Sequence, residues 1–224
     1  MRSQQWLLDL KGHVIRTTTE AAREFWPSPN ELGPPYFNFR LEHIRQVERD
    51  ALHLMEMERG DEEIILAAVW IHDRFQHQFD GAQHADKAGR WTRAHLKDSG
   101  FPAPKVEAVA RAVELHNRRS MDIPQELHES RILWDADRLA RFGPMGLLSY
   151  IMCHLAKDFL GDLSSNRAFR SGSLSIKDFA PLLLEKRDAL YRADWFYFDA
   201  SRTLARRRIS ANREWLDVLE MEIY

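Results

Sequence analysis

The sequence has few of the features that mark secreted and membrane proteins. It has one cysteine in 224 residues, Cys153, which excludes an intramolecular disulfide framework and is typical of a reducing compartment. No apolar run approaches the roughly 18 residues that a membrane span requires. The first residues also lack the apolar centre of about 7 to 15 residues that secretion signals carry. We therefore expect a cytoplasmic protein without a membrane partner.

The sequence also lacks an excess of either sign of charge. Its 32 Lys and Arg stand against 34 Asp and Glu, which gives a formal net charge of -2. This balance provides no overall field that would recruit nucleic acid. The basic run Arg206–Arg208 is followed closely by acidic residues, which favours a solvated helix face over a nucleic-acid patch. No nucleic-acid partner is expected.

The alternation of apolar and polar residues that marks β-strands is missing too. Between Leu41 and Glu58 the apolar residues recur with the period of a helix. The sequence therefore predicts an all-α protein, and we find no internal repeat. Further helices are expected over about 86–99, 126–141, 145–159, 176–194 and 197–221, and in a segment opened by Pro102-Ala-Pro104, with a surface loop over about 161–175.

The N-terminal region is predicted to be separate from this core. Residues 1–26 have the pattern of one or two short helices, and Thr17-x-x-Glu20 has the spacing of a capping box that would open the second. The proline-rich stretch from Trp26 to Pro35 then predicts a loop, because neither a helix nor a central strand accommodates it.

The most informative stretch is the unbroken apolar run Ile64–Ile71, which is followed at once by His72 and Asp73. The run predicts a buried helix, with Asp61 as its N-cap and Gly60 ending the helix before it. An imidazole and a carboxylate at the end of such a helix lie inside the fold, where they require hydrogen bonds or a metal. Other helices should therefore supply partners for them.

Two residues elsewhere in the chain are suited to be those partners. His43 lies beside the apolar stripe of its predicted helix, and Asp137 shares one helix face with Leu133 and Ala140. Two imidazoles and two carboxylates from separate helices make a mixed nitrogen and oxygen site for a divalent cation such as Mn, Fe, Ni, Co or Zn.

These four residues resemble the H…HD…D signature of the HD-domain metal-dependent phosphohydrolases. The similarity covers roughly residues 40 to 155, and the final motif Asp135-Ala-Asp-Arg-Leu139 resembles that of a small bacterial branch. The resemblance implies a compact multi-helix bundle that binds one divalent ion, Mg included, through His43, His72, Asp73 and Asp137. It also implies hydrolysis of a small phosphorylated substrate, most plausibly a nucleotide, by hydroxide on that ion.

The resemblance suggests roles for further residues. Asp73 could also act as the base that orients water, and His116 could protonate the leaving group. A satisfied core histidine is an equal alternative for His116, and an exposed loop is favoured for His84. A second ion is less expected, because the adjacent His-His pair of many relatives is missing. Candidates for binding phosphate are His84, Lys87, Arg90, Arg118 and Arg138.

The resemblance also predicts how the chain is divided. An N-terminal extension would cover residues 1–40, the metal-binding core 41–160, and C-terminal helices 161–224. Those last helices would pack on the core or on a partner in a homodimer. Two other functions stay open: a non-catalytic HD module that binds a nucleotide for regulation, and a metal-dependent oxygenase or lyase, for which Asp135 and Asp86 are poor additional ligands.

Overall fold

The computed structural model describes residues 5–25, 33–35, 37–76, 82–149 and 194–223. The chain divides into two compact units, Met1–Leu139 and Ala140–Tyr224, which we describe separately. The described residues contain no β-strand, so the all-α prediction is confirmed. Among these residues, no helix combines the length and the apolar character that crossing a membrane requires. The predicted boundaries at residues 40 and 160 stay predictions.

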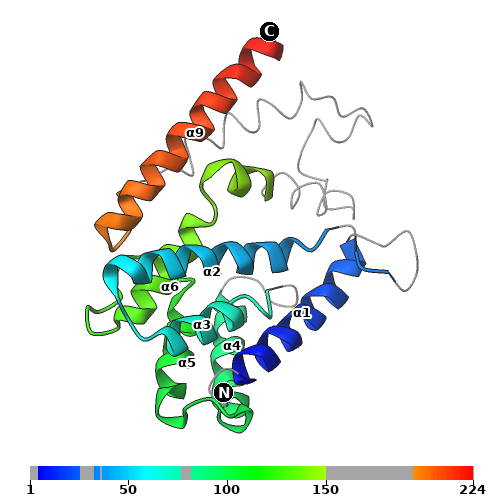
Figure 1. The fold of residues 1–224 in the computed structure, drawn as a ribbon, viewed down its shortest axis with the longest axis vertical. Helices are drawn as coiled ribbons and strands as arrows, with labels where there is room; N and C mark the ends of the chain where they lie inside the picture. The colour runs from blue at the N-terminus through cyan, green and yellow to red at the C-terminus, as the bar shows by residue number, and fades with distance from the viewer. Residues whose placement is uncertain (1–4, 26–32, 36, 77–81, 150–193, 224) are drawn as a thin grey trace. The chain divides into compact units, whose positions relative to one another are not determined.

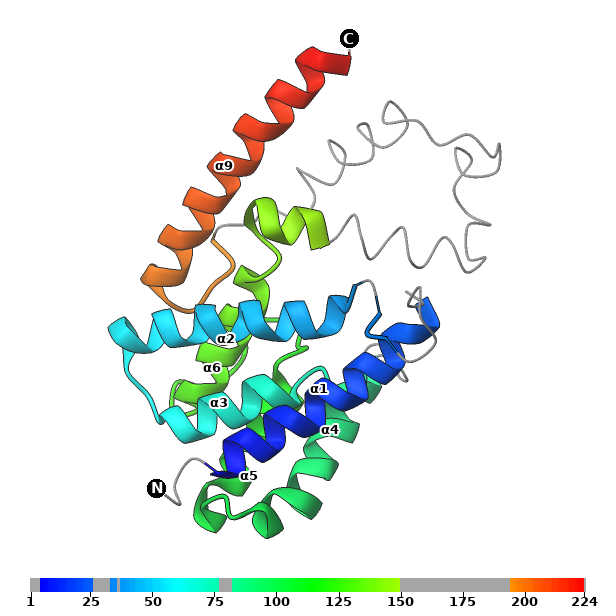
Figure 2. The same cartoon turned by 45° about the vertical axis from the view of Figure 1, so that its right-hand side comes forward.

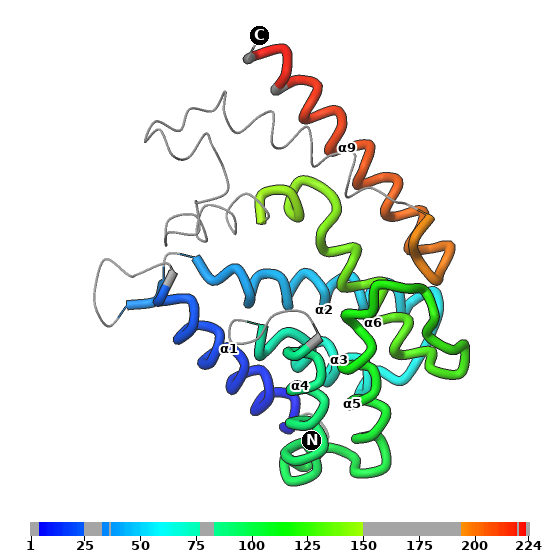
Figure 3. The backbone as a smooth tube through the Cα atoms, turned by 180° about the vertical axis from the view of Figure 1, so that it is seen from behind, coloured from blue at the N-terminus to red at the C-terminus, as the bar shows by residue number. Residues whose placement is uncertain are grey.

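The first unit is a bundle in which α3 holds the central position. This helix packs against α1, α2, α5 and α6, and α4 packs against α5 (Figures 1 and 2). Figure 3 shows α4 and α5 side by side from behind. The helices are α1 (Gln5–Phe25), α2 (Phe39–Glu58), α3 (Glu62–Ile71), α4 (Ala82–His95), α5 (Val106–Leu115) and α6 (His128–Leu139).

The central helix follows the prediction from its sequence. Every residue from Ile64 to Ile71 is buried. The Asp61 side chain caps the helix, since its Oδ1 accepts hydrogen bonds from the backbone N–H groups of Glu63 at 3.1 Å and Ile64 at 3.3 Å. Lys105 adds an ion pair to the Asp61 carboxylate at 2.6 Å. The rigid start and the buried body of α3 together fix the position of its last residues.

A glycine makes the tight connection between α2 and α3 possible. Arg59 and Gly60 have φ angles of 63° and 128°, in the region that side chains disfavour. A Cβ on Gly60 would also lie 2.9 Å from Cδ1 of Ile65. The predicted end of α2 near Gly60 is therefore confirmed, and the turn brings α3 back against α2.

Two helix boundaries differ from the prediction. The N-terminal segment is one helix, and Thr17 lies inside it, where its hydroxyl donates to the carbonyl of His13 at 3.2 Å. The hydroxyl is thus satisfied within the helix, and the capping-box interpretation is wrong. The predicted helix from about residue 86 begins earlier, at Ala82.

The second unit is described only in part. Residues 143–149 are helical, and α9 covers Asp199–Ile223. The buried residues of α9 include Ala205, Ile209 and Leu216, which lie on one helix face. The predicted loop at 161–175, residues 150–159 of the predicted helix at 145–159, and residues 176–193 of the predicted helix at 176–194 lie outside the described residues.

The capping of α3 makes a prediction about stability. We expect Asp61→Ala to lower the free energy of unfolding by about 1 kcal/mol, because two backbone N–H groups lose their acceptor. Urea unfolding at pH 7 measures this loss. Asp61→Asn is the matched control, because it keeps an acceptor oxygen and loses only the charge that pairs with Lys105.

The loss should also depend on pH. Burial raises the pKa of Asp61, but the hydrogen bond from Lys105 and the backbone N–H groups outweigh it, so the pKa is lowered. The stabilisation by this carboxylate is therefore complete above its unfolded pKa of about 3.9 and declines as the pH falls through the lower folded pKa. An equal difference between wild type and Asp61→Asn at all pH values would contradict this account.

Candidate metal centre

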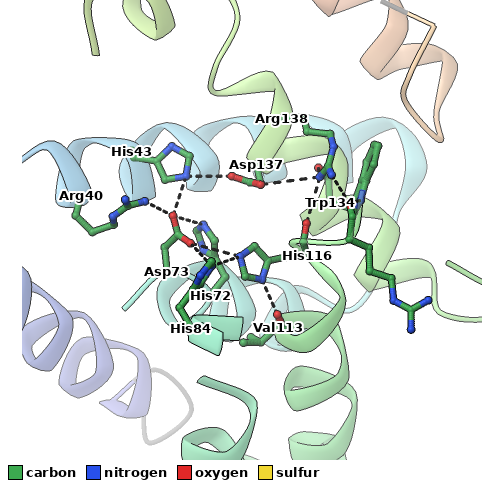
Figure 4. A network of polar contacts seen from close by, with 11 residues as sticks. Arg40, His43, His72, Asp73, His84, Val113, His116, Trp134, Asp137 and Arg138 are labelled. Carbon is green, nitrogen blue, oxygen red and sulfur yellow. Dashed lines mark hydrogen bonds and ion pairs between the residues drawn. The ribbon is translucent and has the colours of Figure 1, made fainter. Parts of the chain in front are cut away.

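Five elements of the first unit bring polar side chains to one buried point (Figure 4). The point is the carboxylate of Asp73, in the turn that directly follows α3. Each side chain around it is at most 7% exposed, in the middle of an otherwise apolar core. The residues are His43 on α2, His72 and Asp73 after α3, His84 on α4, His116 after α5, and Asp137 on α6.

One oxygen of Asp73 faces the predicted metal ligands. Its Oδ2 lies 3.4 Å from Nε2 of His43 and 3.7 Å from Nε2 of His72. Nε2 of His43 lies in turn 3.1 Å from Oδ1 of Asp137. Ligand atoms of His43, His72 and Asp73 fall within 4.8 Å of one another. The structure thus brings the four predicted ligands together.

The other oxygen of Asp73 faces two further histidines. Its Oδ1 lies 3.3 Å from Nε2 of His84 and 3.3 Å from Nε2 of His116, and these two nitrogens are 3.2 Å apart. The expectation of an exposed loop at His84 is wrong, because this residue is 2% exposed on α4. Asp73, His84 and His116 form a second group that could hold an ion.

The ring orientations fit metal ligation. Nδ1 of His72 lies 2.7 Å from the carbonyl of Val69, and Nδ1 of His116 lies 2.5 Å from the carbonyl of Val113. For His72, an N–H donated to the backbone carbonyl leaves the Nε2 lone pair directed at the centre, as in many metal sites. Nε2 of His43 and Nε2 of His72 are buried and, although carboxylate oxygens lie at 3.1 and 3.7 Å, neither nitrogen makes a hydrogen bond. Buried nitrogens in this condition fit a divalent ion.

The protonation states fit as well. Burial lowers the pKa of His72 to about 4, so this imidazole is neutral at pH 7, as a ligand must be. Burial raises the pKa of Asp73, but the Arg40 guanidinium, His72 and hydrogen bonds from His116 and His84 hold it well below its usual range. Asp73 is therefore an anion in the core.

Arg40, in the first turn of α2, provides a cation at this anion. Its Nη1 forms an ion pair with Oδ2 of Asp73, the same oxygen that faces His43 and His72 (Figure 4). The Arg40 side chain is 19% exposed, so it connects the buried carboxylate to the surface. Arg40 could not be predicted from the sequence, because its position one helical turn before His43 shows no periodic signal of its own.

The predicted phosphate-binding cations occupy other positions. Lys87 and Arg90 are exposed on α4, and Arg118 pairs with Asp122 at 3.0 Å. Arg138 donates to the carbonyls of His116 at 3.2 Å, Trp134 at 3.3 Å and Arg118 at 2.6 Å. Its guanidinium also lies 3.2 Å from the centroid of the Trp134 ring. Arg138 thus holds the backbone that carries His116, and its role in substrate binding stays a prediction.

Comparison with protein families identifies the domain. The HD domain family model matches residues 40–141, so this part of the chain carries an HD domain, as its H…HD…D motif predicted. No curated protein matches the sequence.

Solved structures show the same fold over nearly the whole chain. A Lactobacillus plantarum protein has 19% identity and a TM-score of 0.61, with 99% of this chain and 98% of that chain covered. Bacillus subtilis YpgQ, solved in complex with ADP, has 18% identity, a TM-score of 0.60 and 97% coverage of both chains. An HD-superfamily hydrolase from Bacillus thuringiensis has 19% identity, a TM-score of 0.56, and coverage of 95% and 97%. The fold is therefore that of HD-superfamily hydrolases.

The buried His72 makes a prediction for the metal-free protein. An unfolded His72 takes up a proton near its ordinary pKa of 6.5, whereas the folded one resists it until about pH 4. The unfolded state therefore binds more protons between these values, and stability is lost as the pH falls, by up to about 3 kcal/mol from this residue.

Urea unfolding with a chelator present, at pH values from 7 to 4, measures this loss. We expect His72→Leu to reduce the dependence of stability on pH. His53→Leu, at a half-exposed position on α2, is the matched control and should leave the dependence unchanged. Parallel pH profiles for wild type and His72→Leu would show that His72 is not held neutral in the fold.

Proposed function

We propose that this protein is a metal-dependent phosphohydrolase whose substrate is a small phosphorylated metabolite of the nucleotide class. The observation that carries the proposal is the Asp73 carboxylate, buried in a helical core between two pairs of histidines and beside Asp137. An arrangement of neutral imidazoles and ionised carboxylates suits a divalent ion of borderline softness. The HD-superfamily fold supports the same reaction class.

His43, His72, Asp73 and Asp137 would hold the ion. When bound, such an ion lowers the pKa of water and offsets charge on phosphoryl oxygens. Asp73 is ionised and can accept a hydrogen bond from the attacking water, which orients the water for attack. His116 and His84 lie on the opposite side of Asp73 and can donate to phosphate or to the leaving oxygen. Arg40 reaches this point from the surface and can pair with a second anion.

Two observations support a nucleotide as the substrate. YpgQ, which shares the fold, was solved in complex with ADP. In this chain, Arg40 and two histidines surround one carboxylate, which offers several donors to a phosphate chain. The number of ions is a further part of the proposal: we propose one, and a second ion on Asp73, His84 and His116 is the alternative that the geometry allows.

Hydrolysis by the purified protein tests the proposal. We expect nucleotides to be hydrolysed in the presence of Mn²⁺ or Co²⁺, and a chelator to abolish the reaction. Pyrophosphate as product would define a pyrophosphohydrolase, orthophosphate a phosphatase, and neither a cyclic-nucleotide diesterase. His72→Ala and Asp73→Ala should lose at least about 100-fold in kcat, whereas His53→Ala should retain it. Equal activity in all variants would refute the proposal.

The same experiment separates the regulatory alternative from catalysis. A non-catalytic HD module would show a nucleotide-dependent rise in melting temperature without any product. The ionised Asp73 with its ring of imidazoles speaks against this alternative, since a binding site does not require such a buried carboxylate.

The position of Arg40 leads to a separate prediction about kcat/KM and about the affinity for Mn²⁺. We expect Arg40→Met to lower kcat/KM by about 10- to 100-fold, because one charged partner of the phosphate is lost. Its affinity for Mn²⁺ should be unchanged or higher, because a cation that shares Oδ2 of Asp73 has been removed. Steady-state kinetics and calorimetric titration measure the two effects.

Arg45→Met is the matched control for Arg40. Arg45 lies on the same helix, is about half exposed and pairs with Glu42 at 2.8 Å. It should retain both kinetics and metal affinity. Weaker metal binding in Arg40→Met would contradict the role assigned to Arg40, because it would make the guanidinium a support of the site and not a competitor for it.

A further inference from the structure

The residue next to Asp73 has no role in the proposed chemistry, yet it is buried in an unusual way. Arg74 is 6% exposed, and its side chain leaves the metal centre for the space between α1 and α4. There Nη2 lies 2.7 Å from Nε2 of His13, and the guanidinium lies 3.7 Å from the centroid of the Trp91 ring. His13 and Trp91 are themselves stacked, with centroids 5.7 Å apart and planes at 14°.

We propose that Arg74, His13 and Trp91 form a triad of positioning residues, which holds Asp73 and His84 where metal binding requires them. This inference rests on the metal-binding part of the proposed function. It also gives a function to α1, which lies outside the residues that match the HD domain model.

Arg74 acts on Asp73 through the turn that carries both residues. The helix α3 ends at Ile71, and residues 72–76 form a turn. His72 still donates its backbone N–H to the carbonyl of Ala68 at 2.9 Å, so the helix itself orients this residue. Asp73 lies beyond the helix, in a turn whose own backbone hydrogen bonds run from the N–H of Arg74 to the carbonyl of Ile71 and from the N–H of Gln76 to the carbonyl of Asp73, both at 3.1 Å. The neighbouring residue, Arg74, is the anchor of the turn, because its side chain is held by two other helices.

The contact between Arg74 and Trp91 also sets the position of His84. His84 and Trp91 lie on α4, with Trp91 two helical turns after His84 and therefore on the same face. A guanidinium stacked on Trp91 fixes the rotation of α4 about its axis relative to the turn. The same contact therefore sets where the His84 ring lies relative to Oδ1 of Asp73, 3.3 Å away.

The helix α1 takes part through His13. Burial, and next the charge of Arg74, lower the pKa of His13, so its imidazole is neutral and can accept the Arg74 N–H. His13 thereby connects α1 to the residue that follows Asp73. The N-terminal helix thus closes the triad, although none of its residues belongs to the metal centre.

The energetics argue that packing alone does not account for Arg74. Its Nε and Nη1 are buried without a hydrogen-bond partner. An apolar side chain of similar length would fill the same space without leaving donors unsatisfied, and such replacements of buried charges are often neutral or stabilising. A buried arginine with this cost is explained by the geometry that its planar group imposes, because one N–H reaches His13 while the plane stacks on Trp91.

Metal binding by the full-length protein, without substrate, tests the inference. We expect Arg74→Met to leave the melting temperature of the metal-free protein unchanged or higher, while the Kd for Co²⁺ rises by about 10- to 100-fold. The visible absorption bands of bound Co²⁺ should shift, because they report the arrangement of the ligands. Arg74→Lys should still show more than half of the increase in log Kd that Arg74→Met shows, because lysine keeps the charge without the planar group.

A second pair of variants tests the same inference without touching the turn. His13→Leu should weaken Co²⁺ binding, and His13→Gln, which keeps an acceptor oxygen, should recover most of it. We avoid truncating Trp91, because with His13 it lines a cavity of about 170 Å³ that would be enlarged. The control Arg45→Met should match wild type in every measurement.

The outcomes separate this inference from the proposed function. A wild-type Kd and spectrum in both Arg74→Met and His13→Leu would overturn the positioning role, whatever the protein hydrolyses. Weakened Co²⁺ binding in either variant, with an unchanged melting temperature, would support it. Failure of the wild type to bind Co²⁺ would overturn both the inference and the metal-dependent function, whereas absence of nucleotide hydrolysis with intact Co²⁺ binding would overturn only the latter.

Discussion

A carboxylate in the interior of a helical protein has to be stabilised by its surroundings, and in this chain the carboxylate of Asp73 imposes that requirement on the rest of the fold. Imidazoles from three further elements turn toward it, and Arg40 supplies a positive charge. The low pKa of Asp73 shows that these partners outweigh the effect of burial. The remaining elements of the first unit can be understood by how they bring these groups to one point.

The apolar helix α3 makes this arrangement possible. Its buried body fixes His72, and its capped start at Asp61 fixes where the body begins. The helices α2, α5 and α6 pack around it and bring Arg40, His43, His116 and Asp137 to the same buried point. Because the helices are rigid, the ligands are arranged before any ion binds, which reduces the cost of ordering them. The anchoring of Arg74 extends the same principle to the turn after α3.

The sequence was sufficient for the parts of the site that follow helical period. His116 and Asp137 lie on apolar stripes and His43 lies beside one, so local spacing predicted that they point inward. The motif of the HD family then grouped His43 and Asp137 with His72 and Asp73. His84 was assigned to a loop, because the polar residues around it hide the start of α4 at Ala82. Thr17 had the spacing of a cap but lies within a helix, because its hydroxyl can bond to the preceding turn as well.

The residues that sequence reasoning missed depend on tertiary contacts. Arg40 pairs with a residue 33 positions away, and Arg74 binds one 61 positions away. No periodic pattern relates such positions, and arginine is usually a surface residue. The same limit applies to Arg138. Its charge led to the prediction that it binds phosphate, whereas in the structure its N–H groups donate to backbone carbonyls.

The central claim is that Asp73 lies between its histidine partners as the shared ligand of a divalent ion. Anomalous diffraction from crystals soaked in Mn²⁺ tests it most directly. The account predicts an anomalous peak within coordination distance of Asp73, His43 and His72, with Asp137 completing the set and Arg40 moved from Oδ2. A Mn²⁺ peak only at surface carboxylates, with Arg40 still paired to Asp73, would contradict it.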